Sequence, residues 1–326
     1  MISSWYYVAA SVVLFIVYYR KCRECVWGRC KNTSSLQDRV FIVTGANSGI
    51  GKETAKELAK RKATVVMACR NMQNAKNVIS EIRHQISNGE LIPMELDLAS
   101  FSSIREFAAE ILKNFPKIHV LINNAGVYRP LRDRAFTEDG FEIHFGVNYL
   151  GHFLLTNLLI ERLKESAPSR VVIVTSKLLE SGVVDFSNLN GEKCLTIKTR
   201  MNPFYSNSKL ENMYFGIELA QRMKEHNVNV YMVCPGFAYT GLFRHVKRSL
   251  YHYILFMPMA LLFLRTANQA AQTVLHCAIE PSLANESGHL YRNCELYEPN
   301  KQFSSDIAHE LWEKSVELTA SKETAK

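Results

Sequence analysis

The sequence predicts a doubly wound α/β domain with a parallel sheet of about seven strands, preceded by an N-terminal membrane anchor. Short β-branched apolar runs alternate with helical stretches along the chain, as they do in doubly wound parallel sheets. A glycine-rich turn follows the first of these runs, at residues 44–51. The 326 residues suffice for one large α/β domain and a short extra segment.

The apolar runs expected to form the sheet lie near Val40, Val65, Met94, Val120, Val172, Val230 and Leu290. The sequence divides into an anchor at 1–20, a basic cysteine-containing linker at 21–36, a Rossmann domain at 37–300, and a C-terminal helix and tail at 301–326. We find no internal repeat and no low-complexity tract in the sequence.

The glycine-rich turn has the sequence TGANSGIG and separates a strand-like run from a helical stretch at 52–59. Gly45 permits a sharp turn, while Gly49 and Gly51 let the backbone approach a pyrophosphate at a helix N-terminus. A turn without a ligand is the alternative, but strand, loop and helix occur in the required order. The expected dinucleotide contacts are Gly45, Asn47, Ser48, Gly49, Ile50 and Gly51.

A phenol and an ammonium lie four residues apart, at Tyr205 and Lys209. On a helix beginning near Phe204, both side chains would enter the same pocket. A neighbouring cation favours the ionised phenol, so we expect Lys209 to lower the pKa of Tyr205 and make it a proton shuttle. Such a pair suits acid and base chemistry on an alcohol and its carbonyl. Taken alone, the spacing also fits an interfacial Tyr and a solvated Lys.

With these two motifs, four further ones make residues 37–297 resemble the short-chain dehydrogenase/reductase family. They are NNAG at 123–126, VNYLGHF at 147–153, and the pair VTS at 174–176 and CPG at 234–236. A narrower resemblance, to the microsomal retinol dehydrogenase group, rests on MACRN at 67–71, DFSNLN at 185–190, SKLEN at 208–212 and AQTVLHC at 271–277.

The family resemblance implies a catalytic set of Asn148, Ser176, Tyr205 and Lys209. Ser176 would bind the substrate oxygen and stabilise charge developing there. Asn148 would hold the water or helix backbone that links Lys209 to solvent. Cofactor contacts would also come from Tyr205 and Lys209 themselves, and from Asp97, Leu98, Asn124, Ala125, Gly126, Pro235, Gly236 and Thr240.

The cofactor choice depends on the residue that follows the expected second strand, 64–69. An acidic residue there would bind an adenosine ribose, whereas an Arg would pair with a 2′-phosphate. The residue is Arg70, so we expect NADP(H), with a plain surface charge as the alternative.

Two departures from the family pattern lie beside the expected substrate site. Thr175-Ser176 replaces the usual pair of serines, and Lys177 follows it. The stretch from Ser176 to Tyr205 is also longer than in compact members, and its polar part, 191–202, is expected to form a loop at the substrate entrance. A charged Lys177 near an apolar pocket would argue against a purely retinoid substrate, so the sequence leaves the substrate open between retinoids and other lipophilic compounds.

The anchor is expected because no charge precedes Arg20 and aromatic residues lie at both ends of the apolar run. A cleavable signal peptide fits less well, since no charged region precedes the run. Five basic residues follow, Arg20, Lys21, Arg23, Arg29 and Lys31, and place the enzyme domain in the cytosol. The resemblance implies the endoplasmic reticulum membrane, with a lipid droplet or mitochondrial membrane as alternatives.

A second apolar stretch, preceded by basic residues, predicts a substrate lid at about 242–266 that can lie on an anionic bilayer. An ordinary buried helix is the alternative. Part of the net charge of +8 lies beside the expected anchor, so the charge favours contact with a membrane over binding of a nucleic acid. Cys22 and Cys25 form a CxxC, but no second ligand pair follows at zinc spacing, so no metal is expected.

Together these features predict a membrane-anchored, NADP(H)-dependent oxidoreductase acting on a lipophilic alcohol and its aldehyde or ketone, with retinal and retinol as the leading pair. A sterol or fatty-aldehyde reductase is an alternative, because pocket shape decides the substrate. A membrane-tethered dinucleotide-binding scaffold without turnover is another. The sequence also leaves open whether the protein forms a homo-oligomer.

Overall fold

The computed structural model describes residues 2–193, 201–238, 241–243, 257, 260 and 262–320. Its centre is one eight-stranded sheet in the order β3-β2-β1-β4-β5-β6-β7-β8. The strands are β1 Val40–Thr44, β2 Thr64–Cys69, β3 Glu90–Glu95, β4 Val120–Asn123, β5 Ser169–Val174, β6 Val228–Val233, β7 His289–Arg292 and β8 Glu295–Leu296. Every neighbouring pair is parallel except β7 and β8, so the fold is Rossmann-like.

The first seven strands lie where their apolar runs predict, but the eighth was not expected. β8 has only two residues, both exposed, and therefore no apolar run to reveal it. It pairs with β7 through a tight turn in which Asn293 and Cys294 have φ of 58° and 60°. Two positive φ values suit a hairpin turn, for which Asn-Gly is the usual signal, and the Cys hides that signal.

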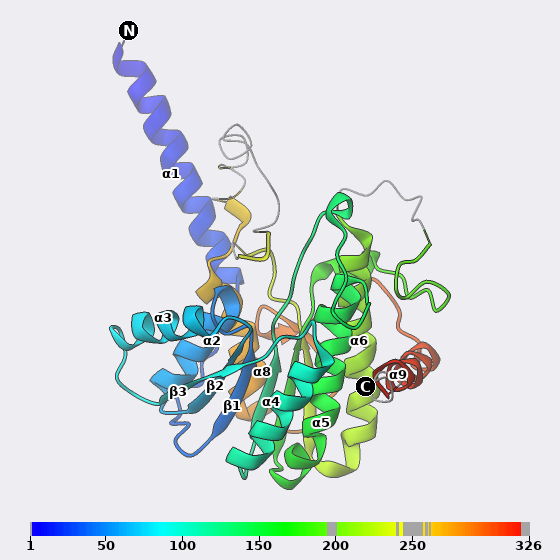
Figure 1. Cartoon of the computed structure of the whole chain (residues 1–326). Helices are drawn as coiled ribbons and strands as arrows, with labels where there is room; N and C mark the ends of the chain where they lie inside the picture. The colour runs from blue at the N-terminus through cyan, green and yellow to red at the C-terminus, as the bar shows by residue number, and fades with distance from the viewer. Residues whose placement is uncertain are drawn as a thin grey trace.

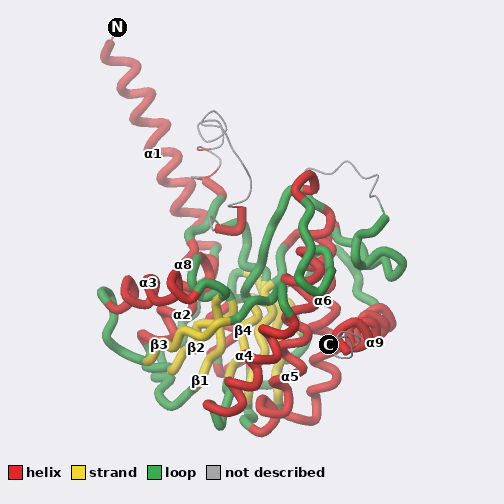
Figure 2. Tube along the Cα trace, viewed as in Figure 1, coloured by secondary structure: helices red, strands yellow, loops and turns green. Residues whose placement is uncertain are grey.

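Helices cover both faces of the sheet (Figures 1 and 2). One face carries α2 Gly49–Lys60, α3 Met72–Arg83 and α8 Ala267–Ile279. The other carries α4 Phe101–Asn114, α5 Gly151–Glu165 and α6 Pro203–Met223, with α9 Ser305–Ala320 packed outside α6. Apolar side chains from the sheet and its covering helices form a separate core on each face.

The strand order reverses direction between β1 and β4, since β2 and β3 lie on one side and β5 to β7 on the other. Ligands of open α/β sheets bind beyond the carboxyl ends of the strands at such a point. The glycine-rich turn after β1 and the NNAG turn after β4 meet there, because β1 and β4 are hydrogen-bonded neighbours.

The N-terminal helix α1 spans Ile2–Val26 and projects away from the Rossmann domain (Figure 1). It therefore continues past the expected end of the anchor at residue 20. Among the residues that the structure describes, no helix is both long enough and apolar enough to cross a membrane. The expected lid at about 242–266 lies largely outside those residues.

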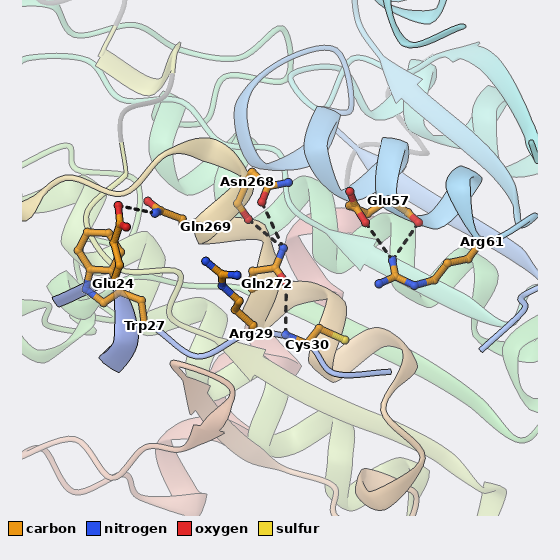
Figure 3. Close-up of a pocket in the computed structure, with 9 residues that line it drawn as sticks. All are labelled: Glu24, Trp27, Arg29, Cys30, Glu57, Arg61, Asn268, Gln269 and Gln272. Atoms are coloured by element: carbon orange, nitrogen blue, oxygen red, sulfur yellow. Dashed lines mark hydrogen bonds and ion pairs between the residues drawn. The ribbon is translucent and has the colours of Figure 1, made fainter. Parts of the chain in front are cut away.

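The segment between α1 and β1 is docked onto α8. The Cys30 amide donates to Gln272 Oε1 at 3.2 Å, and Asn32 Nδ2 donates to the Ile279 carbonyl at 2.6 Å. Figure 3 shows this segment beside α8, where the two border a polar pocket of about 320 Å³. The region expected to be a linker thus packs against the Rossmann domain.

Candidate active site

The start of α6 brings Tyr205 and Lys209 into one buried site. Pro203 occupies the first turn, and the N-cap residue Asn202 accepts a hydrogen bond from the Phe204 amide at 3.0 Å. Tyr205 is only 4% exposed and Lys209 only 3%. The spacing of four residues therefore places both on the inward face of the helix, as the sequence predicts.

Lys209 is fixed by the end of β5. Its Nζ donates to the Val174 carbonyl at 2.9 Å and lies 5.9 Å from the centroid of the Tyr205 ring. Burial disfavours the ammonium and lowers the pKa of Lys209 from 10.5 to about 8. An ammonium has three N–H donors, so two remain after the bond to Val174.

The environment of Tyr205 corrects one expectation. Burial of the phenol raises the pKa of Tyr205, whereas Lys209 was expected to lower it. The hydrogen bond from Ser176 acts in the opposite direction and lowers this pKa, but burial is the larger effect. Within this arrangement Tyr205 is a protonated phenol at neutral pH, which suits a proton donor.

Ser176 lies just beyond the end of β5 and faces Tyr205. Its Oγ accepts a hydrogen bond from the Leu178 amide at 3.2 Å, which caps a short 3₁₀ turn at Lys177–Ser181. Ser176 is half-buried, while the next side chain, Lys177, is exposed. Lys177 thus points to solvent, and Thr175 Oγ1 is engaged elsewhere, donating to the Lys209 carbonyl at 2.7 Å.

Asn148 is fully buried in a π-helical turn, Phe145–Leu150, that leads into α5. Its Oδ1 accepts from the Val127 amide at 2.7 Å, and its Nδ2 donates to the Val127 carbonyl and to Ser208 Oγ, both at 3.1 Å. π-helical turns are rare in proteins overall, but those that occur are frequently found at functional sites. Asn148 thereby joins the loop after β4 to α6.

A buried hydroxyl and a buried imidazole, of Thr44 and His152, connect the glycine-rich turn to this site; both lie in motifs found in the sequence, but nothing in the sequence assigned either a role. A carbonyl oxygen only accepts, so His152 Nδ1 donates to the Asn148 carbonyl at 3.0 Å. The other ring nitrogen of the neutral imidazole, Nε2, therefore accepts from Thr44 Oγ1 at 2.9 Å. Thr44 Oγ1 in turn accepts from the Asn124 and Ala125 amides, both at 2.9 Å. Burial lowers the pKa of His152 to about 4, so the ring is neutral.

The glycines leave backbone uncovered where a dinucleotide would approach. A Cβ on Gly51 would lie 2.5 Å from the Gly45 carbonyl oxygen and 2.6 Å from Asn124 Nδ2, so only glycine fits. Gly45 and Gly49 have φ of 66° and 53°, which also favours glycine. At Gly126 a Cβ would meet only Asn148 Oδ1 at 3.5 Å and Lys209 Nζ at 3.8 Å. These residues fit a nicotinamide dinucleotide.

The remaining expected contacts border the same edge of the sheet. Ser48 precedes α2 and is exposed, whereas Asn47 and Ile50 are half-buried and Leu98 and Pro235 are buried. Arg70 has a side chain that is 63% exposed, with Nε 3.9 Å from Asp97 Oδ2. Gly236 has a φ of 79°. Thr240 lies outside the described residues.

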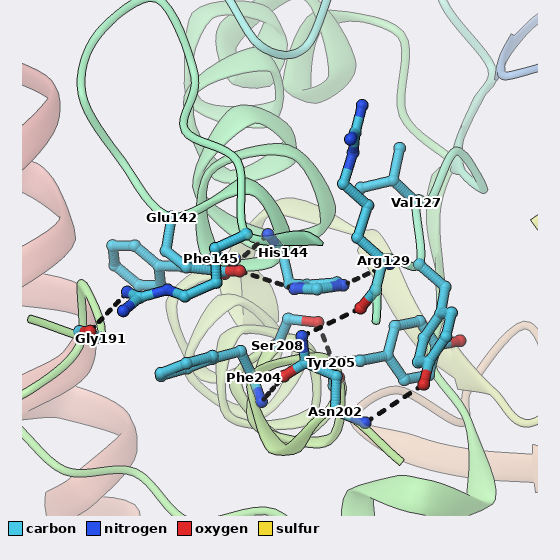
Figure 4. A network of polar contacts seen from close by, with 12 residues as sticks. Val127, Arg129, Glu142, His144, Phe145, Gly191, Asn202, Phe204, Tyr205 and Ser208 are labelled. Carbon is cyan, nitrogen blue, oxygen red and sulfur yellow. Dashed lines mark hydrogen bonds and ion pairs between the residues drawn. The ribbon is translucent and has the colours of Figure 1, made fainter. Parts of the chain in front are cut away.

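A polar network surrounds the start of α6 (Figure 4). His144 Nε2 accepts from the Arg129 amide at 3.0 Å, so its Nδ1 must donate to Glu142 Oε1 at 2.7 Å. The Arg129 carbonyl accepts from Asn202 Nδ2 at 3.0 Å. The His144 ring packs edge-on against the Tyr205 ring, with centroids 6.0 Å apart. Sequence reasoning missed these residues, since nothing in their spacing links them.

Comparison with known proteins gives concordant results. The short chain dehydrogenase family model matches residues 39–250. The chain is 44% identical over 292 residues to human retinol dehydrogenase 11, covering 89% of each protein. It is 40% identical to mouse retinol dehydrogenase 14, covering 85% of each, and 39% identical to human retinol dehydrogenase 13, covering 89% of this chain and 87% of that protein.

Among solved structures, an uncharacterized protein from Mycobacterium Paratuberculosis has a TM-score of 0.68 and 30% identity, covering 90% of this chain and 97% of the other. An NAD(P) dependent gluconate 5-dehydrogenase from Beutenbergia cavernae has a TM-score of 0.63 at 20% identity, covering 79% and 96%, which supports the fold alone. The sequence motifs, the fold and these comparisons agree. The chain belongs to the short-chain dehydrogenase family and is an oxidoreductase related to the retinol dehydrogenases.

Proposed function

We propose that the chain is an NADP(H)-dependent oxidoreductase that interconverts an apolar alcohol with its aldehyde or ketone, retinal and retinol being the leading pair. The observation that carries the proposal is the convergence of Ser176, Tyr205 and Lys209 in one buried site. This site lies beside the glycine cradle, the backbone left uncovered at Gly45, Gly49, Gly51 and Gly126. The names of the three relatives reported above, which are retinol dehydrogenases, support the substrate pair.

In the proposed reduction, the hydroxyls of Ser176 and Tyr205 bind the carbonyl oxygen and hold it in place. The chemistry that NADPH would supply, if held by the backbone at Gly45, Gly49 and Gly51, is a hydride for the carbonyl carbon. Tyr205 gives its proton to the oxygen, which completes the alcohol, and the raised pKa of this phenol keeps it protonated until then. Ser176 stabilises the negative charge that develops on the oxygen.

Lys209 and Asn148 are proposed to support this proton transfer. The two N–H donors that Lys209 retains would bind the nicotinamide ribose, and its charge would stabilise the phenolate that remains on Tyr205. Asn148 holds the Val127 backbone beside Lys209 and would keep water within reach of the ammonium. Reprotonation of Tyr205 then returns the site to its starting state.

The preference for NADP(H) rests on Arg70. Its guanidinium follows β2 at the edge of the cradle and is largely exposed. The ion-pair contact with Asp97 is long, at 3.9 Å, so a 2′-phosphate could replace it by a closer, charge-assisted interaction. The backbone amide of Asp97 donates to Ser103 Oγ at 2.9 Å.

We also propose that α1 associates with a membrane, that of the endoplasmic reticulum, with the catalytic domain facing the cytosol. Among the residues that the structure describes, the helix exposes apolar side chains, including Leu14 at 68% and Phe15 at 65%. An apolar groove of about 850 Å³ lies between α1 and the segment that leads into α8. A lipophilic substrate and a bilayer both suit such a surface.

The test is NADPH consumption by the full-length protein in detergent, with retinoid, steroid and fatty aldehydes as substrates. Turnover of retinal that Tyr205→Phe abolishes would support the proposal. Faster turnover of another class would reassign the substrate, and dinucleotide binding without turnover of any aldehyde would indicate a scaffold.

A further inference from the structure

The turn after β6 is held from the side by a buried arginine. Arg265 is only 4% exposed, and its Nη1 donates to the Pro235 carbonyl at 3.2 Å. Its amide donates to the Phe237 carbonyl at 2.8 Å, and the two strands of chain form a short parallel bridge at Ala238. Arg265 therefore contacts the turn through both its backbone and its guanidinium.

The contact with Gly236 is especially close. A Cβ on this glycine would lie 2.9 Å from both Cζ and Nε of Arg265, so the guanidinium lies directly against the backbone. Gly236 also has a φ of 79°, a conformation that favours glycine. The position of Arg265 thus constrains the position of the turn.

Arg265 is in turn packed against the N-terminal segment. The Trp27 ring lies 5.1 Å from the Arg265 guanidinium carbon and is only 5% exposed. The other Nη of Arg265 donates to Asn293 Oδ1. Gly28 packs against the same residue, since a Cβ there would lie 1.7 Å from the Asn293 carbonyl oxygen. Trp27 and Gly28, which follow α1, therefore contact Arg265 and its hydrogen-bond partner Asn293, respectively.

The end of α1 also holds the residues on either side of Arg265. Arg20 donates to the Leu264 carbonyl at 2.6 Å, and its guanidinium carbon lies 4.6 Å from the Trp27 ring centroid. Glu24 accepts from Gln269 Nε2 at 3.1 Å, a contact visible in Figure 3. Gln269 is part of the capping box that begins α8.

From these contacts we infer that the juxtamembrane segment of residues 20–28 positions the turn at Pro235 and Gly236 through Arg265, and so forms part of the support of the cofactor site. This inference rests on the proposed function in one respect, that the dinucleotide lies against this turn. It assigns the segment a role besides that of a tether. Trp27 and Arg265 are positioning residues, because neither needs to touch the cofactor.

Loss of the Trp27 ring removes the packing of one face of a buried guanidinium. We expect Trp27→Ala to raise the KM for NADPH roughly 3- to 30-fold, the range that corresponds to a partly buried cation–π contact, with a smaller change in kcat. Trp27→Phe retains an aromatic face and should recover most of the loss. Arg29→Ala is the matched control, because Arg29 is exposed and lies near Trp27, directly after this segment.

The experiment combines these kinetics with hydrogen exchange of the full-length protein in detergent without cofactor. The inference predicts that Trp27→Ala speeds amide exchange in peptides covering residues 234–238 but leaves peptides from β1 and β2 unchanged. Arg265→Lys, whose single ammonium cannot reproduce the separate guanidinium contacts with Pro235 and Asn293, should speed exchange in the same peptides. The double variant should show less than the sum of the single effects, because both act on one contact.

Unchanged exchange at 234–238 in Trp27→Ala, relative to Arg29→Ala, would overturn the inference. If Trp27→Ala unfolds globally, with fast exchange in β1 and β2 as well, Trp27→Phe and Arg265→Lys decide by the same criterion. If the wild-type protein binds no dinucleotide, the proposed function fails, while the exchange measurement still decides whether the segment controls the turn.

Discussion

The side-chain amide of Asn202 donates to the Arg129 carbonyl over 3.0 Å, and this bond ties the start of α6 to the loop that follows β4. The same side chain accepts from the Phe204 amide, so one residue both caps the helix and fixes its place. Tyr205 is the third residue of that helix. The position of the phenol therefore depends on a contact made three residues earlier in the chain.

Two substitutions separate these two tasks of Asn202. Asn202→Ser keeps a capping oxygen but cannot reach Arg129, so we expect nearly normal stability and a kcat lowered by roughly tenfold or more. Asn202→Ala also loses the cap and should reduce the free energy of unfolding by about 0.5–2 kcal/mol. Urea denaturation and initial rates measure both effects. Equal kcat in the serine variant and the wild type would show that the Arg129 contact does not position Tyr205.

Tyr205→Phe tests the proton donor. The substitution removes only the hydroxyl, so turnover should fall by at least roughly 10²-fold, while the dissociation constant for NADPH changes little. Steady-state rates and a fluorescence titration with NADPH give the two quantities. A variant that keeps near-normal turnover would exclude Tyr205 as the acid.

The pH dependence of reduction should report Lys209. The pKa of this ammonium is lowered to about 8, so its charge is present below that pH and lost above it. The raised pKa of Tyr205 keeps the phenol protonated over the same range. We therefore expect kcat/KM for the aldehyde to be level below about pH 7 and to fall as pH rises through about 8.

Lys209→Arg provides the control for this profile, because a guanidinium keeps its charge throughout the range. Its activity will be lower, since the forked group cannot reproduce the bond to Val174, but the decline near pH 8 should disappear. A profile with the same decline in the variant would assign the titration to another group.

Arg70→Asp tests the cofactor preference. It replaces an attraction for the 2′-phosphate by a repulsion, so the KM for NADPH should rise far more than the KM for NADH. Arg70→Lys keeps the charge without the fork and should have an intermediate effect. An unchanged ratio of the two KM values would show that Arg70 is a plain surface charge.

Membrane orientation can be read from a glycosylation sequon at Asn285-Glu286-Ser287. Asn285 is exposed, so a luminal domain would present it to the glycosylation machinery. The basic residues that follow residue 19 predict instead an unmodified Asn285 and a domain that protease digests in intact microsomes. Asn32, in the other sequon, is bonded to Ile279 and is a weaker reporter. An endoglycosidase-sensitive glycan together with protease protection would reverse the orientation.

The sequence by itself determined the elements whose cause is local. Apolar runs near Val40, Val65 and Val172 predicted strands that the structure contains, because a short continuous run of β-branched apolar residues is typical of a parallel strand buried on both faces. The four-residue spacing of Tyr205 and Lys209 predicted a shared helix face, since the helical period fixes it. The motif order also predicted the family, which the comparisons confirm.

Only the tertiary structure decided the electrostatics and the supports of the site. The pKa of Tyr205 is raised because the phenol is buried, and burial depends on residues far away in the sequence. His144, Asn202 and Arg265 act through contacts across 15, 73 and 30 residues of chain, so no spacing rule could find them. Local sequence sets which element a residue occupies, but desolvation and hydrogen-bond partners arise from surfaces that meet only when the chain folds.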